Sequence, residues 1–177
     1  MNQASDYLVD HIRSRAGVAE LPADVATLLT RISNDFDTTP DVTKFREFAE
    51  GYTAAWCSHK PASVASFYSD NGSLSVNSGA PAVGRKAIAE VAQGFFTDFP
   101  DLIVLMDDLL AHSNRAVYCW TLIGTNTGPG GRGKRVHIGG FEVWKIGADD
   151  LIAESLGFFD SAVYNYQLEN GVDAKPE

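Results

Sequence analysis

The sequence predicts an α+β fold in which three helices pack on one face of a strongly curved, mostly antiparallel mixed sheet. Two observations support this prediction. Up to about residue 99, apolar residues recur at the spacing of one helix face. From Leu102 onward they follow strand-like patterns separated by short turn sequences such as Ser113–Asn114. Helices that precede a run of strands, rather than alternating with them, indicate an α+β architecture.

An N-terminal helical extension is expected before this domain. Two short apolar stripes at helical spacing occur there, and Pro22 stands where the first turn of the second helix begins. Residues 33–41 (SNDFDTTPD) are rich in turn formers and acidic residues, which is typical of a linker. We therefore assign residues 1–40 to the extension and linker, residues 41–170 to the principal domain, and residues 171–177 to a frayed tail.

The principal domain is expected to begin with three helices. The first has an aromatic-rich face and ends before Pro61, because a proline disfavours helical geometry in the preceding residue. Pro61 opens a short second helix, and the third runs from Arg85 to Phe99. A short strand is predicted between them at residues 73–76 (SLSV).

Four strands and a closing helix are expected in the second half of the chain. The predicted ranges are Leu102–His112, Arg115–Thr125, Lys134–Ile146 and Leu151–Phe159 for the strands, and Ser161–Leu168 for the helix. The segment Gly128–Gly133 (GPGGRG) matches the spacing of a dinucleotide-binding fingerprint. That motif needs a helix after it, whereas a strand pattern follows here, so the segment is predicted to be a hairpin loop.

The composition limits the possible partners. With 177 residues, the chain has room for one domain and an extension. Its 14 basic and 23 acidic residues give a net charge of −9, which argues against nucleic-acid or anionic-membrane partners. No apolar run is long enough for a membrane span, and no signal peptide is recognisable. Cys57 and Cys119 fit reduced core thiols, so a cytoplasmic location is expected.

Both faces of the predicted strand Arg115–Thr125 are apolar. Val117 and Cys119 lie on one face, and Tyr118 and Trp120 lie on the other. Because the helices of a two-layer domain cover only one sheet face, the second apolar face indicates an interface. We expect a homodimer through the sheet. The alternative is that the N-terminal extension covers this face within the same chain.

The histidines and cysteines show no spacing typical of a metal site, so no metal is expected. His137 alternates along its strand with Gly139 and Phe141 and could donate a hydrogen bond in a pocket. A structural role for His137 is the alternative.

Two carboxylates stand out because they lie in apolar strands. Glu142 shares a strand face with Ile138 and Trp144, and it must be paired, exposed or protonated. A structural pair across the sheet is one interpretation, and its role stays open. Asp160 ends the apolar run LGFFD. It could be the N-cap of the final helix, or a carboxylate at the mouth of an apolar cavity that acts as a general base.

Several motifs together resemble the SnoaL-like polyketide cyclases of the nuclear transport factor 2-like superfamily. The resemblance runs from Phe45 to Leu168. Its motifs are the helix that ends in Trp56, VGRKAI at 83–88, FPDL at 99–102, WTLIGTNTG at 120–128 and GFFDSAVYNYQL at 157–168. The residues before the resemblance form the predicted extension.

The resemblance implies a cone-shaped fold with an apolar cavity between three helices and a curved sheet, and commonly a dimer. It also implies that Asp160 is the acid/base that abstracts a proton for an intramolecular aldol closure. The cyclases often carry a histidine in the sequence GTHxG, where this chain has Asn126. Asparagine can hydrogen-bond a carbonyl oxygen but cannot transfer a proton.

The leading hypothesis is an enzyme without a cofactor that acts on a hydrophobic, carbonyl-bearing small molecule. Asp160 would remove an acidic α-proton, and Asn126 and His137 would contact substrate oxygens. Other predicted substrate-binding residues are the aromatic side chains Tyr52, Trp56, Trp120, Phe141 and Phe158. The alternatives are a non-catalytic binding module with the same cavity, and an isomerase or dehydratase of the ketosteroid isomerase type.

Overall fold

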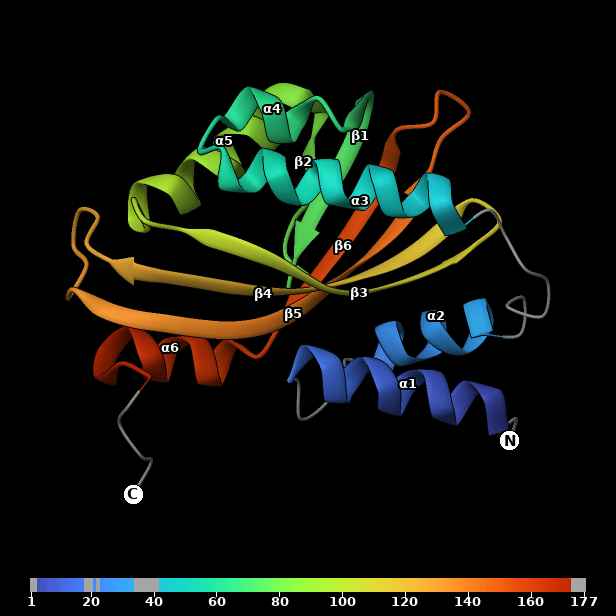
Figure 1. Ribbon diagram of the computed structural model, residues 1–177, viewed down its shortest axis with the longest axis horizontal. Coiled ribbons are helices and arrows are strands. Elements are labelled where there is room, and N and C mark those ends of the chain that lie inside the picture. The colour runs from blue at the N-terminus through green and yellow to red at the C-terminus, as the bar shows by residue number, and fades with distance from the viewer. Residues whose placement is uncertain (1–2, 18–20, 22, 34–41, 173–177) are drawn as a thin grey trace.

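The computed structural model describes residues 3–17, 21, 23–33 and 42–172, and it confirms the predicted α+β fold (Figure 1). The helices are α1 (Gln3–Ala16), α2 (Ala23–Ser33), α3 (Val42–Cys57), α4 (Pro61–Ala65), α5 (Gly84–Asp98) and α6 (Ser161–Asn170). The strands are β1 (Tyr68–Val76), β2 (Ala82–Val83), β3 (Ile103–His112), β4 (Arg115–Asn126), β5 (Lys134–Ile146) and β6 (Ile152–Phe159).

The strands form one six-stranded sheet in the order β2-β1-β6-β5-β4-β3. β1 and β6 are parallel, and the other neighbouring pairs are antiparallel, so the sheet is mixed as predicted. Helices α3, α4 and α5 lie together on one side of the curved sheet, while α1 and α2 lie on the other (Figure 1). The strand expected at 73–76 is longer than predicted, because residues 69–72 form a bulge that links it to Tyr68.

Helix α3 delivers the largest aromatic side chains to the core. Tyr52 and Trp56 stand one turn apart and are 0% and 8% exposed, as their spacing predicts. The helix ends as expected ahead of Pro61, and His59 takes a positive φ of 55° after its last turn. The His59 ring bonds the carbonyl oxygen of Leu102 at 2.8 Å, which ties this end of the helix to the start of the sheet.

The extension packs on the sheet face opposite to α3 and α5. Ile12 of α1 and Leu29 of α2 are both 0% exposed. Together with Val25 they form an apolar cluster with strand side chains, which we call the outer cluster. Its strand members are Val117, Cys119, Phe141, Val143 and Phe158. The alternative considered for this face, a cover supplied by the same chain, is therefore what the structure contains.

A polar contact also holds α1 to the sheet. The His11 ring and the Asp108 carboxylate are 2.7 Å apart. Burial by itself would raise the pKa of Asp108. Hydrogen bonds from His11 and from the Leu109 backbone N–H outweigh it and leave this pKa below its ordinary value. The Asp108 carboxylate is thus kept charged where the extension meets β3.

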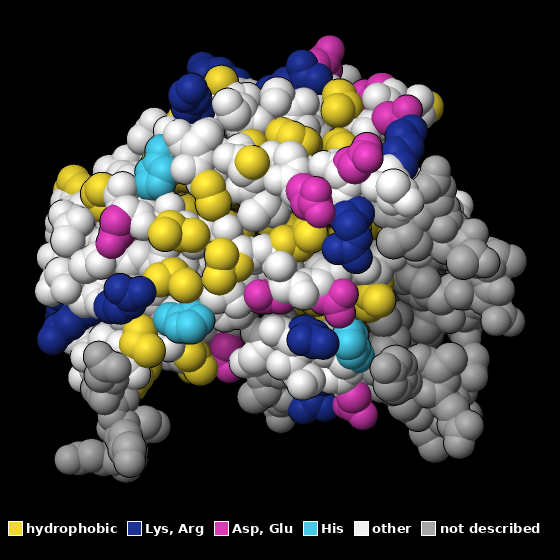
Figure 2. Space-filling model, in the orientation of Figure 1, with side chains coloured by type: hydrophobic (Ala, Val, Ile, Leu, Met, Phe, Trp, Pro, Cys, Tyr) yellow, Lys and Arg dark blue, Asp and Glu magenta, His cyan; other side chains and the backbone are white. Residues whose placement is uncertain are grey.

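A homodimer through the sheet stays a prediction, but the face that suggested it is occupied by α1 and α2. Exposed apolar side chains on the sheet include Ile103 and Leu105 of the edge strand β3, which are 49% and 47% exposed. Figure 2 shows hydrophobic side chains gathered across the middle of the face viewed, with charged side chains of both signs around them. A dimer contact at this edge would leave the extension in place.

The division of the chain at residue 40 also stays a prediction. Residues 34–41 of the predicted linker and residues 173–177 of the predicted tail lie outside the described residues. The core between the sheet and α3, α4 and α5 contains buried side chains from Ala49 to Ile152 and partly buried ones from Phe45 to Leu168, and the described residues of the extension contribute none. The principal domain (residues 41–170) therefore has a core of its own, whereas the outer cluster also needs side chains from α1 and α2.

We expect a chain that lacks residues 1–37 to keep a folded principal domain and to associate more strongly than the intact chain. Deletion would expose the strand side chains of the outer cluster to water, and large apolar patches favour association. Sedimentation velocity at several concentrations would measure this, with melting curves to confirm that the domain stays folded.

A point variant makes the same test without shortening the chain. Ile12→Asp places a charge in the outer cluster and should weaken docking of the extension by about 2 kcal/mol or more. Ser14→Asp, on the exposed side of α1, is the matched control. Equal hydrogen-exchange protection of α1 in both variants would contradict the docking described here.

Candidate functional site

An apolar cavity lies between the inner face of the sheet and helices α3 and α5. The space between atoms here is about 600 Å³ with open solvent at its mouth included, and about 50 Å³ of it can be reached by the centre of a water-sized molecule. Its lining residues are Trp56, Leu74, Val76, Val91, Phe95, Val104, Tyr118, Trp120, Leu122, Ile138, Glu142, Gly157 and Phe159. Glu142 is the acidic residue among them. A small molecule held here would meet almost only apolar surface, with the Glu142 side chain forming part of the wall.

Strand β5 places Glu142 in this cavity by simple alternation. Ile138 and Trp144 lie on the same face of the strand and join the inner core, whereas Phe141 and Val143 point to the outer cluster. Glu142 pairs with Tyr118 on β4 and with Gly157 on β6. It is 7% exposed.

Three neutral donors surround the Glu142 carboxylate. Its Oε2 accepts hydrogen bonds from Ser155 Oγ at 2.6 Å and Trp144 Nε1 at 2.8 Å. Tyr52 Oη lies 3.2 Å from Oε2 and 3.3 Å from Oε1. Within the described residues, Oε1 has only this longer contact and no Lys, Arg or His lies in salt-bridge range. Oε2 therefore accepts the two shortest hydrogen bonds, and Oε1 retains accepting capacity.

Burial raises the pKa of Glu142 above its ordinary value. The hydrogen bonds from Ser155, Trp144 and Tyr52 favour the charged form and offset only part of this effect. A carboxylate with a raised pKa is a stronger base than an ordinary one, which favours its use in general acid/base catalysis.

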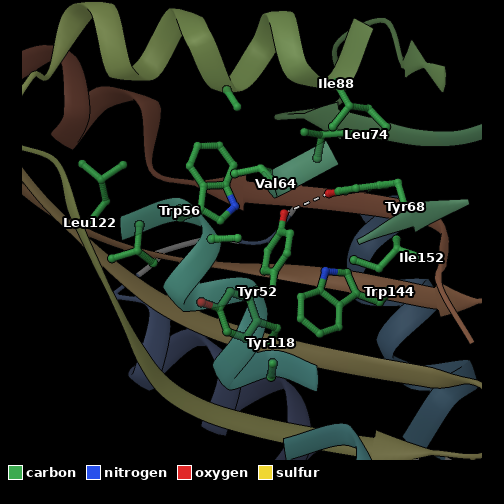
Figure 3. Close-up of a cluster of buried hydrophobic side chains, with 14 of the residues drawn as sticks. Tyr52, Trp56, Val64, Tyr68, Leu74, Ile88, Tyr118, Leu122, Trp144 and Ile152 are labelled. Atoms are coloured by element: carbon green, nitrogen blue, oxygen red, sulfur yellow. Dashed lines mark hydrogen bonds between the residues drawn. The ribbon is translucent and has the colours of Figure 1, made fainter. Parts of the chain in front are cut away.

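A second tyrosine extends the hydrogen-bond network. Tyr68 Oη lies 2.9 Å from Tyr52 Oη, as the dashed line in Figure 3 shows. Burial first, and the nearby Glu142 second, raise the pKa of both tyrosines, so both remain neutral donors. Each hydroxyl has one hydrogen, so when Tyr52 donates to Glu142, Tyr68 must donate to Tyr52. Figure 3 also shows Trp144 beside Tyr52, below this pair.

Asp160 caps helix α6. Its Oδ1 accepts hydrogen bonds from the backbone N–H groups of Ala162 at 2.9 Å and Val163 at 3.0 Å. These are the bonds of an N-cap, one of the two roles considered for this residue. Asp160 follows Phe159, which lines the cavity, but is not itself a lining residue. Its predicted role as the base stays a prediction.

Asn126 and His137 lie outside the cavity lining. Asn126 is at the end of β4, where its Oδ1 accepts a bond from the Arg132 backbone N–H at 3.3 Å. It thereby shapes the Gly-rich hairpin loop. His137 is exposed, and the Gln167 side chain bonds both its N–H at 2.7 Å and its carbonyl at 3.1 Å. Gln167 thus covers the edge of β5 beyond the end of β6.

The predicted aromatic residues divide between the two faces of the sheet. Trp56 and Trp120 line the cavity, and Tyr52 bonds the carboxylate beside it. Phe141 and Phe158 instead pack in the outer cluster, because each is one residue away from an inward-facing position. Phe159 occupies the place in the cavity that was expected for Phe158.

The sequence does not reveal the hydrogen-bond network around Glu142. Ser155 on β6 and Tyr68 on β1 carry no motif, and they come near the carboxylate only because β6 and β1 follow β5 in the sheet. A serine within the apolar strand β6 was the available signal in the sequence.

Among the described residues, no three His, Cys, Asp or Glu side chains cluster in a way that could hold a metal ion. No described helix is long and apolar enough to cross a membrane.

The family model for SnoaL-like polyketide cyclases matches residues 46–168. The chain belongs to this family. No curated protein sequence matches it. The matched residues begin in α3 and end in α6, so α1 and α2 lie outside the SnoaL-like part.

Solved structures with this fold cover most of the chain. A putative SnoaL-like polyketide cyclase from Jannaschia sp. CCS1 has 17% identity and a TM-score of 0.66, covering 77% of this chain and 99% of that one. A ketosteroid isomerase-like protein from Catenulispora acidiphila, in complex with trimethylamine, has 14% identity and a TM-score of 0.63, covering 78% and 100%. The epoxide hydrolase/cyclase-like enzyme SalBIII acts in pyran ring formation in the polyether salinomycin. It has 17% identity and a TM-score of 0.60, and the match covers 69% of this chain and 95% of SalBIII.

The raised pKa of Glu142 predicts a pH-dependent stability difference between the SnoaL-like chain and its Glu142→Gln variant. A folded-state pKa above the unfolded value near 4.5 means that the folded chain binds the extra proton. Stability from this group is therefore complete below that pH and is lost as pH rises through the folded-state pKa. The variant lacks this loss, so its melting temperature should rise relative to the parent as pH increases.

Thermal melts of both proteins between pH 4 and pH 8 would measure the difference. Taking the difference cancels the opposite contributions of carboxylates with lowered pKa, such as Asp101 and Asp108. A difference that is flat, or that falls with pH, would show that Glu142 is not destabilised in its charged form.

Proposed function

We propose that this SnoaL-like protein binds a hydrophobic, carbonyl-bearing small molecule in the inner cavity and transfers a proton with Glu142. The observation that carries the proposal is a buried carboxyl group in a cavity that is otherwise apolar. A carboxylate is costly to bury. The side chains around Glu142 keep it there through hydrogen bonds from neutral donors, and no salt bridge forms with any described residue.

The proposed reaction is an intramolecular aldol cyclisation that needs no cofactor. Oε1 of Glu142 takes a proton from the carbon next to a substrate carbonyl, and the electron pair of the C–H bond forms an enolate. The enolate carbon attacks a second carbonyl of the same molecule, and a C–C bond forms. The resulting alkoxide takes the proton back from Glu142. Conjugated carbonyls in the substrate would spread the enolate charge.

Membership of the family and the cyclase-like neighbour SalBIII favour cyclisation over other uses of the same base. An isomerase would instead return the proton to a different carbon of the conjugated system. A dehydratase would use the enolate to expel a hydroxyl group. All three reactions begin with the same proton abstraction, so one assay can test the shared step.

Asp160 remains the second candidate base. It is the position that the family resemblance indicates, and it follows directly after Phe159 at the cavity. Its two backbone hydrogen bonds belong to the cap of α6 and occupy Oδ1. Glu142 is favoured because it lines the cavity and because burial raises its pKa.

We expect the protein to catalyse exchange of the α-protons of a bicyclic ketone with D2O, and Glu142→Gln to lower the rate about 100-fold or more. Glutamine keeps the volume and accepts the bonds from Ser155 and Trp144, but it is not a base. α-Tetralone is the test ketone, and exchange is followed by proton NMR.

Asp160→Asn is the matched variant in this assay, because asparagine caps a helix about as well as aspartate. Retained exchange in Asp160→Asn, together with loss in Glu142→Gln, supports the proposal. The reverse pattern would assign the base to Asp160. Binding of the ketone without any enhanced exchange would indicate a non-catalytic binding module.

A further inference from the structure

Trp120 lines the cavity and has a buried donor for which the described residues supply no partner. Its Nε1–H is shielded from solvent, and among the described residues no acceptor lies within hydrogen-bond range. The other buried indole near the carboxylate, Trp144, donates to Glu142 at 2.8 Å. Buried polar groups in proteins are nearly always bonded, so an exception at a cavity calls for an explanation. A phenylalanine could provide similar apolar surface without this donor.

The strand next to Trp120 is shaped to hold the indole ring. Trp120 pairs with Gly140 across β4 and β5. A Cβ atom at Gly140 would collide with Cζ2 and Cη2 of the indole, so the ring rests directly on the backbone of β5. Phe159 lies on the other side of Gly140 in the sheet, and its ring centre is 6.3 Å from that of Trp120. The glycine therefore allows a large ring at this point of the wall.

The indole and the carboxyl group belong to the same cavity. Gly140 and Glu142 face the same side of β5 and are two residues apart, which corresponds to roughly 7 Å along a strand. A ligand of fused rings could thus reach both groups, with an oxygen at Trp120 and an acidic C–H group at Glu142. Trp120 and Glu142 both line the enclosed space.

We propose that the Trp120 Nε1–H donates a hydrogen bond to the carbonyl oxygen of the bound ligand, and to the same oxygen when it becomes an enolate. A ligand oxygen would satisfy this buried donor, which has no partner among the residues that the structure describes. The bond strengthens as the oxygen gains negative charge, so the indole stabilises the enolate more than the ketone. The inference takes its ligand class from the proposed function, and it assigns the group that selects a ketone over a hydrocarbon of the same shape.

The test compares α-tetralone with tetralin, which has the same bicyclic skeleton without the oxygen. The chain has 3 tryptophans, so a 15N-labelled sample gives three indole N–H signals, and Trp120→Phe identifies one of them. We expect α-tetralone to move the Trp120 proton signal downfield and tetralin to leave it without a downfield shift. Trp144, already bonded to Glu142, is the internal reference.

Affinity provides the second measurement. Trp120→Phe should weaken α-tetralone binding about three- to tenfold, as expected for one hydrogen bond, and should change tetralin binding less than twofold. Equal losses for both ligands would mean that Trp120 acts through packing alone and would overturn the proposal. The proposal would also be overturned if α-tetralone did not shift the Trp120 N–H signal, or if both ligands shifted it equally.

The NMR shift of the Trp120 indole N–H does not depend on Glu142 acting as a base. In Glu142→Gln the ketone-specific shift of Trp120 should persist even though proton exchange is lost. A persistent shift with no exchange in any variant would refute the proposed catalysis and leave the donor role intact. If Trp120→Phe does not fold, the wild-type comparison of the two ligands decides, with the signal assigned by Trp56→Phe and Trp144→Phe.

Discussion

The structure depends on a carboxyl group held in an apolar interior by neutral donors. Glu142 faces the cavity because β5 alternates, and its cost of burial is reduced by Ser155 and Trp144 at 2.6 and 2.8 Å. No cation of the described residues neutralises it. The charged form of Glu142 is therefore costly to bury, and the arrangement leaves a proton acceptor beside a cavity. In the function that we propose, the same cost of burial favours uptake of a proton from the substrate.

The two faces of the sheet carry out different tasks. The inner face encloses the cavity together with α3 and α5, whereas the outer face is covered by α1 and α2 (Figure 1). The family match begins at residue 46, after the extension. The helices α1 and α2 that cover the outer face are therefore an addition to the matched part of the chain. Phe141 of β5 and Phe158 of β6 pack against the extension, on the face of these strands that is opposite to the cavity. Packing of the extension therefore supports the strand that positions Glu142.

The fold could be predicted from the sequence because its signals are local. Helical spacing marks α3 and α5, and the change to strand patterns after residue 99 marks β3 to β6. The site was less predictable, because both faces of β4, β5 and β6 are apolar and alternation alone does not identify the inner one. Adjacent Phe158 and Phe159 look equivalent in the sequence, and only Phe159 lines the cavity. The bond from Tyr52 to Glu142 spans 90 positions in sequence, and no local pattern encodes it.

The central claim is that the interior raises the proton affinity of Glu142. The most direct measurement is a 13C NMR titration of the glutamate side-chain carboxyl carbons, with the Glu142 signal assigned by its loss in Glu142→Gln. The account predicts a Glu142 pKa clearly above the ordinary value of 4.5. A midpoint at or below that value would show a carboxylate stabilised in its charged form, and it would contradict the assignment of Glu142 as the proton-transferring group.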